Sequence, residues 1–257
     1  MAQSKSHEAL VGSQFGSQAA AYLVSAVHAQ GDDLRALAEI AGSRPNARVL
    51  DLGCGGGHVS FNAAPYAREV VAYDLSADML AVVAAAAASR GLTNIRTEQG
   101  VAERLPFDES SFDCVLSRYS AHHWRDVGAG LREVARVLKP GGVAGFVDVV
   151  SSGVPLFDTW LQALELLRDP SHVRDYGRGE WEASFAGAGL VVEAADAHRI
   201  RLEFGPWVER IRTPAVQVEA IRALQATMSE GVRRHFDVSD DGSFSLSVAT
   251  FRLAKPV

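Results

Sequence analysis

The amino-acid sequence predicts an α/β fold in which helices cover both faces of a doubly wound, mostly parallel β-sheet. Short runs of β-branched and apolar residues alternate with helical patterns from position 48 onward. A glycine-rich turn, GCGGG, follows the first of these runs at 53–57. The chain has 257 residues, which is long enough for one α/β domain with a full core. Such alternation is typical of βαβ crossovers, whose strands are parallel.

The alternating part of the chain contains five expected strands and three expected helices. The strands are 49–52, 70–74, 95–99, 112–117 and 143–149. The helices between them are 58–65, 78–90 and 127–138, and the KPGG run at 139–142 ends the last of these.

The rest of the chain has a looser pattern. A helix with Trp160 on its apolar face and a second helix near 181–188 precede a run at 190–204 that has strand character. A helical stretch at 206–236 is followed by the alternating segment SFSLSVATFRLAK at 243–255. We expect this last segment to form an antiparallel edge strand. The sheet would then have seven strands, with the 206–236 stretch as a helical insertion covering one end.

The N-terminal segment is expected to form a pair of helices that act as a lid. The run AAAYLVSAVHA at 19–29 has features of a secretory signal, but Ser25, His28 and the helical spacing beyond it favour a helix. Tyr22, Ser25 and His28 share one helix face. Together with Phe15 they either contact a ligand or pack against the sheet. No apolar run approaches the ~20 residues of a membrane span.

Composition argues against several classes of partner. The formal net charge is −6, with acidic and basic residues interspersed, so there is no basic stripe of the kind that nucleic acids or anionic membranes require. The two cysteines, Cys54 and Cys114, are far apart and have no His or Cys at metal-ligand spacing. This pattern predicts neither a disulfide framework nor a metal site. We expect a cytoplasmic protein.

The turn after the first strand carries acidic residues that restrict its ligand. It places backbone N–H groups at the carboxyl edge of the sheet, where ligands of such folds bind. The dinucleotide fingerprint has a third glycine where this chain has His58, and Asp51 would repel a pyrophosphate. Asp51 suits an ammonium group instead, and Asp74, at the end of the second strand, suits both ribose hydroxyls. S-adenosylmethionine meets both requirements.

Four motifs, in order, resemble those of class I S-adenosylmethionine-dependent methyltransferases, which have a Rossmann-like fold. They are VLDLGCGGG (49–57), VVAYDLS (70–76), GVAERLPFDESSFDCVLSRYSAHHWRD (100–126) and EVARVLKPGG (133–142). The chain is similar to the branch that contains the ubiquinone and menaquinone C-methyltransferases and their uncharacterised bacterial relatives. The resemblance covers about residues 45–150. It implies methyl transfer from S-adenosylmethionine, which becomes S-adenosylhomocysteine, to a small-molecule acceptor.

The resemblance also implies roles for individual residues in binding S-adenosylmethionine. The methionyl part is expected to contact Asp51, Gly53, Gly55, Ser117 and Arg118. The ribose is expected to contact Asp74, and the adenine Leu75, Met79, Ala102 and Glu103. Glu103 could instead be a surface charge.

One position departs from the family pattern. The family usually has Asp where this chain has Val101, a position associated with the adenine amino group. The change removes a hydrogen-bond acceptor and is expected to weaken adenine recognition by ~1 kcal/mol.

The loop after the fourth strand supplies the candidates for catalysis. Tyr119, His122 and His123 follow that strand at the edge where the methyl group should point. Histidine suits general-base work because it titrates near neutral pH. Adjacent histidines are not expected to point the same way, so one would pack or bond to backbone, and His123 is the preferred site residue. Asp148, at the end of the fifth strand, is expected to orient a neighbour.

The acceptor is expected to be a small molecule, and the resemblance favours an aromatic or quinone-like ring. The Asn/Asp-Pro-Pro-aromatic signature of adenine and glutamine methylases is absent at 117–120, and neither cysteine is placed for RNA cytosine methylation. The polar segment RDPSHVRDYGRGEW at 168–181 either forms the acceptor pocket or is a solvated loop.

The chain is expected to form one methyltransferase domain over 1–257. It would comprise the N-terminal helical lid at 1–43, a cofactor-binding core at 44–150, and acceptor-side helices with the C-terminal strands at 151–257. Two alternatives stay open. One is a non-catalytic module that binds S-adenosylmethionine or S-adenosylhomocysteine, and the other is an NAD-dependent dehydrogenase, which Asp51 and His58 disfavour.

Overall fold

In a computed structural model, the chain forms a seven-stranded sheet between two layers of helices, and residues 6–16 and 31–257 are described. The strands are β1 (Ala47–Leu52), β2 (Ala67–Asp74), β3 (Ile95–Gln99), β4 (Phe112–Arg118), β5 (Leu138–Val149), β6 (Val191–Leu202) and β7 (Phe244–Ala254). Their order is β3-β2-β1-β4-β5-β7-β6. All pairs among β1 to β5 are parallel, whereas β7 is antiparallel to both neighbours. The predicted fold class is confirmed.

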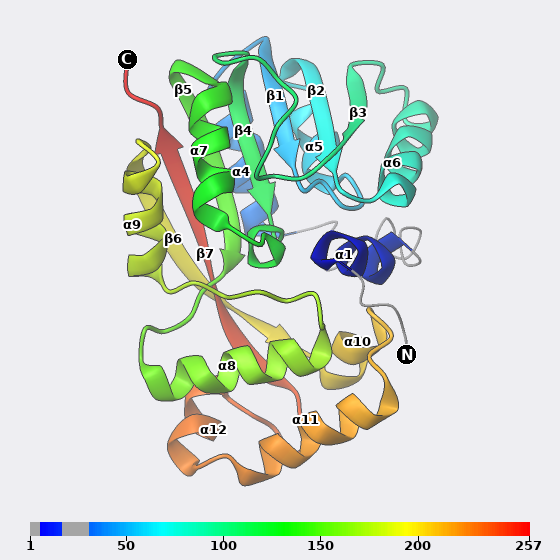
Figure 1. The fold of residues 1–257 in the computed structure, drawn as a ribbon, viewed down its shortest axis with the longest axis vertical. Coiled ribbons are helices and arrows are strands. Elements are labelled where there is room, and N and C mark those ends of the chain that lie inside the picture. Colours follow the sequence, from blue (N-terminus) through cyan, green and yellow to red (C-terminus); the bar gives the residue numbers. More distant parts are fainter. Residues whose placement is uncertain (1–5, 17–30) are drawn as a thin grey trace.

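The helices lie on both faces of the sheet and at one end of it (Figure 1). One face is covered by α4 (Asp32–Gly42), α5 (His58–Ala63) and α6 (Ala77–Ser89). The other is covered by α7 (Val127–Val137) and α9 (Arg178–Gly187). The remaining helices are α1 (His7–Gly16), the 3-10 turn η1 (Ala121–His123), α8 (Pro155–Arg168), α10 (Phe204–Glu209), α11 (Ala215–Thr227) and α12 (Glu230–Phe236).

The last strand does not form the edge of the sheet, so the sequence-based prediction of its position was wrong. β7 lies between β5 and β6 and pairs with both. The run at 190–204 forms β6, which pairs with β7 alone and therefore takes the edge position. Most of β6 is exposed, whereas most of β7 is buried, as expected for an edge strand and its interior neighbour.

Helix α4 packs directly on the sheet. Leu37 and Ile40 are buried against β5, where Gly145 leaves room for them. A Cβ on Gly145 would lie 2.6 Å from Leu37 Cδ2 and 2.9 Å from Ile40 Cδ1. Within the segment assigned to the lid, α4 thus belongs to a sheet-covering layer, whereas α1 lies at the carboxyl end of the strands (Figure 1).

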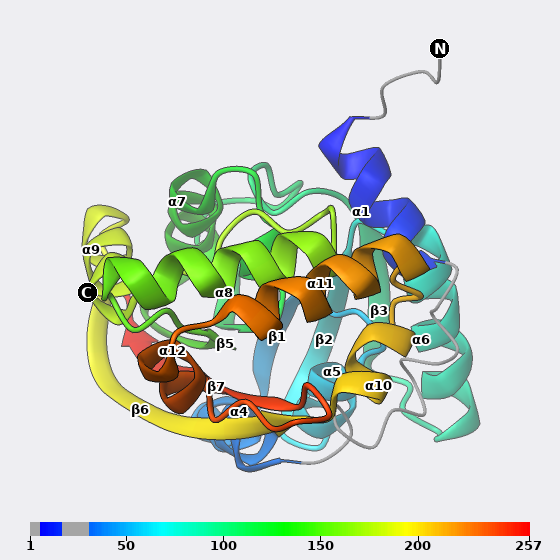
Figure 2. The same cartoon turned by 90° about the horizontal axis from the view of Figure 1, so that it is seen from below.

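A group of helices, α8, α10, α11 and α12, packs on the projecting ends of β6 and β7 and forms a second apolar core (Figures 1 and 2). The stretch predicted to be helical at 206–236 contains most of α10 and all of α11 and α12. Pro214 precedes α11, and Ser229 caps α12 by accepting a hydrogen bond from the Val232 N–H. We call this group of four helices the helical cap. It lies beyond the carboxyl ends of β1 to β5 (Figure 1), and residues of α8 and α10 line the cavity at those ends.

Candidate active site

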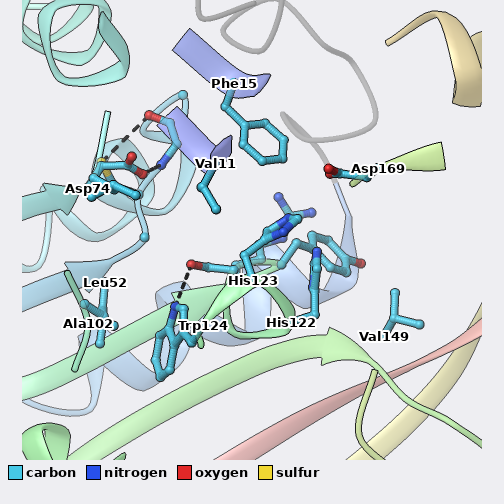
Figure 3. Close-up of a pocket in the computed structure, with 18 of the residues that line it drawn as sticks. Val11, Phe15, Leu52, Asp74, Ala102, His122, His123, Trp124, Val149 and Asp169 are labelled. Atoms are coloured by element: carbon cyan, nitrogen blue, oxygen red, sulfur yellow. Dashed lines mark hydrogen bonds between the residues drawn. The ribbon is translucent and has the colours of Figure 1, made fainter. Parts of the chain in front are cut away.

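A cavity of about 550 Å³ lies at the carboxyl ends of the parallel strands. Sites for small molecules have volumes of roughly 300–1,000 Å³. Val11 and Phe15 of α1 face this cavity opposite the ends of the strands (Figure 3). Phe15 was predicted for the lid and lines the cavity. Tyr22, Ser25 and His28 lie outside the described residues.

Close packing requires two glycines of the turn between β1 and α5. At Gly53, where φ is 74°, a Cβ would lie 1.8 Å from Ser120 Oγ. At Gly57, where φ is 81°, it would lie 2.9 Å from Phe61 Cζ. Gly55 also has a positive φ of 48°, but within the described part of the chain a Cβ there would meet no atom within 4 Å. Gly55 therefore borders the cavity with its backbone, which a ligand can approach closely.

Asp51, at the end of β1, is fully buried and incompletely hydrogen-bonded. Its Oδ2 accepts a hydrogen bond of 2.6 Å from Ser60 Oγ, and its Oδ1 has no hydrogen-bond partner among the described residues. Burial raises the pKa of Asp51 to about 7. The residue also lines the cavity. An ammonium group placed there would satisfy the orphaned oxygen and favour the ionised carboxylate.

Asp74, at the end of β2, is held between the glycine turn and α6. Its Oδ2 accepts from the Gly55 N–H at 2.8 Å and its Oδ1 from the Ser76 N–H at 2.8 Å. Burial raises the pKa of Asp74, and these backbone hydrogen bonds oppose that effect. A carboxylate offers about four acceptor sites, so two remain for the hydroxyls of a ribose.

The next part of the cavity wall is largely apolar. Leu75, Met79 and Ala102 all line it, and Met79 is buried. The Val101 carbonyl accepts a hydrogen bond of 3.2 Å from the Tyr73 hydroxyl. These residues form a surface suited to a flat apolar ring.

Glu103 lines the cavity, but its carboxylate also stabilises the loop after η1. Its Oε1 accepts from the backbone N–H groups of Arg125, at 2.9 Å, and Asp126, at 3.3 Å. The residue is therefore a structural link within the site and not merely a surface charge.

Ser117 and Arg118, at the end of β4, are placed differently from each other. Ser117 Oγ donates to the Leu52 carbonyl at 2.9 Å, and the residue is not among those that line the cavity. Arg118 does line it and forms an ion pair in which its Nε lies 2.8 Å from Asp33 Oδ2. Both side chains of this pair are 5% exposed. The pair ties the first turn of α4 to the end of β4.

Tyr119 follows in an unusual backbone conformation, with φ at 51°. Its side chain lines the cavity. Burial and the charge of Asp33 raise the pKa of the Tyr119 hydroxyl, so this group is a hydrogen-bond donor near neutral pH and not a base.

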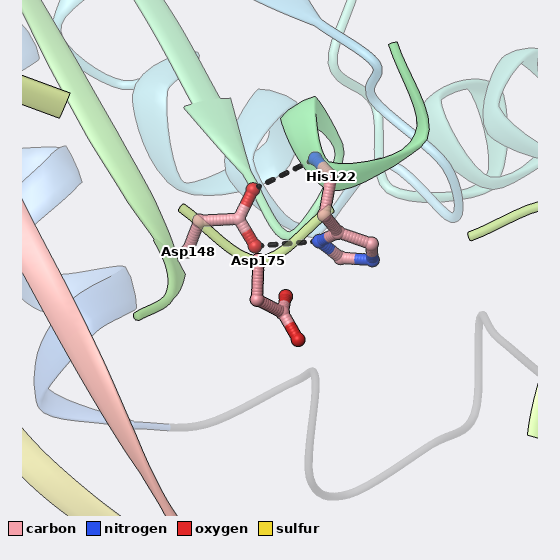
Figure 4. Close-up of side chains that lie close together, drawn as sticks. All are labelled: His122, Asp148 and Asp175. Carbon is pink, nitrogen blue, oxygen red and sulfur yellow. Dashed lines mark hydrogen bonds and ion pairs between the residues drawn. The ribbon is translucent and has the colours of Figure 1, made fainter. Parts of the chain in front are cut away.

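His122 forms a dyad with Asp148, which confirms the expectation that Asp148 orients a neighbour. His122 Nδ1 lies 2.6 Å from Asp148 Oδ1, and the His122 N–H lies 3.3 Å from Asp148 Oδ2 (Figure 4). Because the carboxylate only accepts, the proton of the neutral ring is on Nδ1. Burial disfavours the charged ring, but the charge and hydrogen bond of Asp148 outweigh it and raise the pKa of His122 to about 9.

His123 lines the same cavity, so the expectation that the two rings point different ways was wrong, whereas the expectation that one of them bonds to backbone is confirmed by His123 itself. Their centroids are 4.1 Å apart. Partners on different segments hold both rings on the cavity side: Asp148 holds His122, and the Ser171 carbonyl lies 3.2 Å from His123 Nδ1. The ring also meets Phe15 edge-on at 5.0 Å. Burial, together with the neighbouring His122, lowers the pKa of His123 to about 3, so this ring is neutral.

The segment at 168–181 forms part of the cavity wall. Of its residues, Arg168, Asp169 and Asp175 line the cavity, joined by Glu165 from the end of α8. These four were not among the predicted site residues. The polar composition of the segment was the signal, but only the fold shows which of its side chains point inward.

Another part of the wall at this end is apolar and also escaped prediction. It is formed by residues from the ends of β5, β6 and β7 and from α10, namely Val149, Ile200, Leu202, Trp207 and Leu246. It adjoins the polar segment, because Arg168 Cζ lies 5.1 Å from the centroid of the Trp207 ring. A ligand here would meet both an apolar surface and the histidines and carboxylates.

The comparisons agree with this architecture. Residues 50–146 match the family described as "Methyltransferase domain". The chain is 53% identical over 192 residues to the "Uncharacterized protein YafE" of Escherichia coli. The aligned region is 75% of this chain and 93% of that protein. It is 38% identical over 201 residues to the "Uncharacterized methyltransferase YcgJ" of Bacillus subtilis, covering 78% and 79%. The crystal structure of YcgJ aligns with a TM-score of 0.84 and 34% identity over 88% of this chain and 98% of that one.

A shorter match is to the "Demethylmenaquinone methyltransferase" of Chlorobaculum tepidum, 35% identical over 102 residues, which are 39% of this chain and 40% of that protein.

The mixed sheet with antiparallel β7, together with the glycine turn, defines an α/β methyltransferase fold. This fold and the similarity to these relatives together show that the chain belongs to the class I S-adenosylmethionine-dependent methyltransferases. This membership excludes the dehydrogenase alternative. Among residues 6–16 and 31–257, none of the helices is both long enough and apolar enough to span a membrane.

Proposed function

We propose that this methyltransferase acts on a small-molecule acceptor that combines an aromatic or quinone-like ring with a nucleophile carrying a dissociable proton. One observation carries the proposal. A single continuous cavity connects Asp74, at the glycine turn, with His122 and the apolar wall beneath the helical cap. A donor and an acceptor can therefore meet in one cavity, which favours methyl transfer by alignment.

The glycine-turn end is the proposed site of the methyl donor. Asp51 would take the ammonium group, since its Oδ1 is buried and without a partner in the described chain. Asp74 would take the ribose hydroxyls, and Leu75, Met79 and Ala102 would contact the adenine. When bound, S-adenosylmethionine supplies a methyl group on a positively charged sulfur that leaves as a neutral thioether.

The smaller roles in donor binding follow from the same geometry. Gly53 and Gly55 would approach the methionyl part with backbone alone, and Arg118 would border it. Glu103 would support the adenine side through the loop that it stabilises. Ser117 would not contact the ligand but would hold the end of β1 in place through its hydrogen bond to the Leu52 carbonyl.

His122 is the proposed general base. Asp148 fixes the ring proton on Nδ1, and within the described residues His122 Nε2 makes no hydrogen bond. The neutral ring would therefore take the acceptor's proton on Nε2 while the acceptor's electron pair forms the new bond to the methyl carbon. A pKa of about 9 makes His122 a strong base, whose neutral fraction grows as the pH approaches that value.

His123 and Tyr119 are proposed to position the acceptor. The Ser171 carbonyl accepts from Nδ1 of neutral His123, which leaves the Nε2 lone pair available for a donor on the acceptor molecule. Tyr119, whose protonated hydroxyl is hydrogen-bonded to Asp33, would border the acceptor.

An aromatic or quinone-like ring fits the apolar wall around Trp207 and Leu246. The named activity of the Chlorobaculum relative supports this class of acceptor. We also propose a cytoplasmic location and no nucleic-acid partner, which the two buried free thiols and the net charge of −6 support.

Transfer of tritiated methyl from S-adenosylmethionine tests the proposal. The purified protein is offered fractionated bacterial metabolites and a panel of phenols and quinols. We expect transfer by the unmodified protein and a loss of about 10²- to 10⁴-fold in His122→Gln. A control, His235→Gln, changes a ring that stacks on Phe157 away from the cavity and should keep full activity. If no fraction accepts label although S-adenosylhomocysteine binds, the chain is a non-catalytic binding module.

A further inference from the structure

The acceptor end of the cavity contains three buried carboxylates from the end of α8 and the loop after it. Glu165, Asp169 and Asp175 all line the cavity and are 7%, 2% and 2% exposed. Figure 3 shows the Asp169 carboxylate pointing toward the two histidines. Buried carboxylates are costly unless positive charge or hydrogen-bond donors satisfy them. A carboxylate that no hydrogen-bond donor or cation of the protein reaches is therefore a candidate for binding a cationic ligand.

Two of the three carboxylates have partners within the protein. Asp169 Oδ1 accepts from the Ser171 N–H at 2.8 Å and from Ser171 Oγ at 2.6 Å. Glu165 Oε2 lies 3.5 Å from Arg168 Nη1. The same arginine donates from Nε to the Trp207 carbonyl, at 3.1 Å.

Asp175 is different, because its carboxylate is buried and one oxygen is orphaned. Asp175 Oδ2 has no hydrogen-bond partner among the described residues. The ring of His172 lies 4.0 Å away, but its Nε2 is engaged with Gln162 Oε1 at 2.9 Å. Burial lowers the pKa of His172 to about 3, so that ring brings no charge. Burial raises the pKa of Asp175, so its ionised form is an acceptor without a donor that a cationic group would stabilise.

Two other cations at the cavity are paired with acids outside this cluster. Arg118 pairs with Asp33, and Arg201 pairs with Asp237. His122 is hydrogen-bonded to Asp148 and also lies beside Asp175, since ligand atoms of these three residues are within 4.8 Å of one another. Asp148, Glu165, Asp169 and Asp175 thus outnumber His122 and Arg168, the cations that contact members of this group.

We propose that this end of the cavity binds an organic ammonium group of the acceptor through Asp175, with Glu165 and Asp169 beside it. The inference rests on the proposed function, because it assigns the ammonium group to the methyl acceptor. The acceptor would then combine a ring on the wall around Trp207 with a cationic amine at the carboxylates.

A metal ion fits the same place less well. Ligand atoms of His122, Asp148 and Asp175 lie within 4.8 Å of one another (Figure 4). Asp148, however, already accepts from His122 Nδ1, the His122 N–H and the Val149 N–H, at 2.6, 3.3 and 2.9 Å. Asp175 is then the member of the trio with an unused oxygen, whereas a structural or catalytic metal takes at least three protein ligands. An ammonium group needs fewer acceptors.

Three probes with the same ring test the inference by calorimetric titration in the presence of S-adenosylhomocysteine. They are 2-phenylethylamine, 2-phenylethanol and phenylacetate, which differ in charge. We expect the amine to bind about tenfold or more tightly than the other two. Asp175→Asn should remove that preference and Glu165→Gln should reduce it. The matched control Glu219→Gln, an exposed acid on α11, should leave it unchanged.

Equal binding of the three probes, or no binding of the amine, overturns the inference. It is also overturned if Mn²⁺ binds tightly and Asp175→Asn abolishes that binding, because the site is then a metal site. Amine binding without methyl transfer to any acceptor would retain the ammonium site but reject the proposed function. Methyl transfer to uncharged aromatic acceptors without amine binding would retain the proposed function and reject the ammonium site. Circular dichroism of each variant confirms that it folds.

Discussion

The two ends of the cavity are built in different ways. At the glycine-turn end, nearby backbone groups hold Asp74. Its carboxylate accepts hydrogen bonds from the backbone N–H groups of Gly55 and Ser76, both within 20 residues of it in the sequence. At the acceptor end, His122 and His123 depend on Asp148 and Ser171, which are 26 and 48 positions away. Each end nevertheless contains a buried carboxylate oxygen that lacks a hydrogen-bond partner in the described chain, on Asp51 and on Asp175.

This difference suggests how such a site diversifies. A donor site made of one turn and two strand ends can be retained as a unit, because its geometry depends on neighbouring positions. The acceptor end brings together η1, β5 and two helices of the helical cap, α8 and α10, so changes in any of these alter its shape. We propose that a ligand with N–H donors completes both ends through these two orphaned oxygens.

The largest effect is expected at the boundary between the two ends, where Arg118 pairs with Asp33. Arg118→Met leaves a buried carboxylate without its counter-charge and should lower the free energy of unfolding by about 3–5 kcal/mol. Denaturant unfolding measures the change. Arg35→Met, which breaks the exposed pair with Asp32, serves as the control and should cost less than about 1 kcal/mol. Equal losses in both variants would show that the Arg118 pair does not anchor α4.

A smaller, pH-dependent effect is expected at the acceptor end from Asp148→Asn. The folded pKa of His122, about 9, exceeds its unfolded value of roughly 6.5. The ion pair therefore stabilises the fold fully below pH ~6.5, by about 3 kcal/mol, and this contribution disappears as the pH rises through 9.

Unfolding measured at both ends of this range checks the prediction. Asp148→Asn should be less stable than the unmodified protein at pH 6, and the difference should shrink toward pH 10. Asp196→Asn, an exposed acid on β6, should show no such trend. A deficit that stays constant with pH would mean that His122 is not charged in the folded protein.

The smallest effect is expected at the adenine side of the glycine-turn end. Val101→Asp restores the acceptor that the family pattern has at this position and should tighten S-adenosylhomocysteine binding about fivefold, or ~1 kcal/mol. Val101→Leu adds no acceptor and should bind like the unmodified protein. If the aspartate leaves the affinity unchanged, adenine recognition depends on backbone groups alone.

The sequence predicted the strands β1 to β5 and the acids at their ends because these depend on local patterns. Asp51 and Asp74 could be placed at one edge since parallel strands end together. The position of β7 could not be predicted in the same way. An alternating pattern shows that a strand has two faces but does not show which neighbours it pairs with, and β6 competes for the same edge.

The acceptor end could be predicted only in part. His122 and His123 were found because they follow β4, and Asp148 because it lies at the end of β5. Asp175 lies in a loop whose composition is equally typical of a solvated connection, so nothing local indicates that its side chain is buried. Ser117 shows the opposite case: it follows the family pattern, but its hydroxyl bonds to the Leu52 carbonyl behind the cavity wall.

Calorimetric titration of the purified protein with S-adenosylhomocysteine, and separately with NAD, tests the central claim most directly. The claim is that the glycine-turn end binds the methyl donor through Asp74. We expect S-adenosylhomocysteine to bind in the micromolar range and NAD not to bind. Asp74→Ala, which removes two charge-assisted hydrogen bonds to the ribose, should weaken binding about 100-fold or more. An unmodified protein that ignores S-adenosylhomocysteine, or an Asp74→Ala variant that binds it equally well, would contradict the claim.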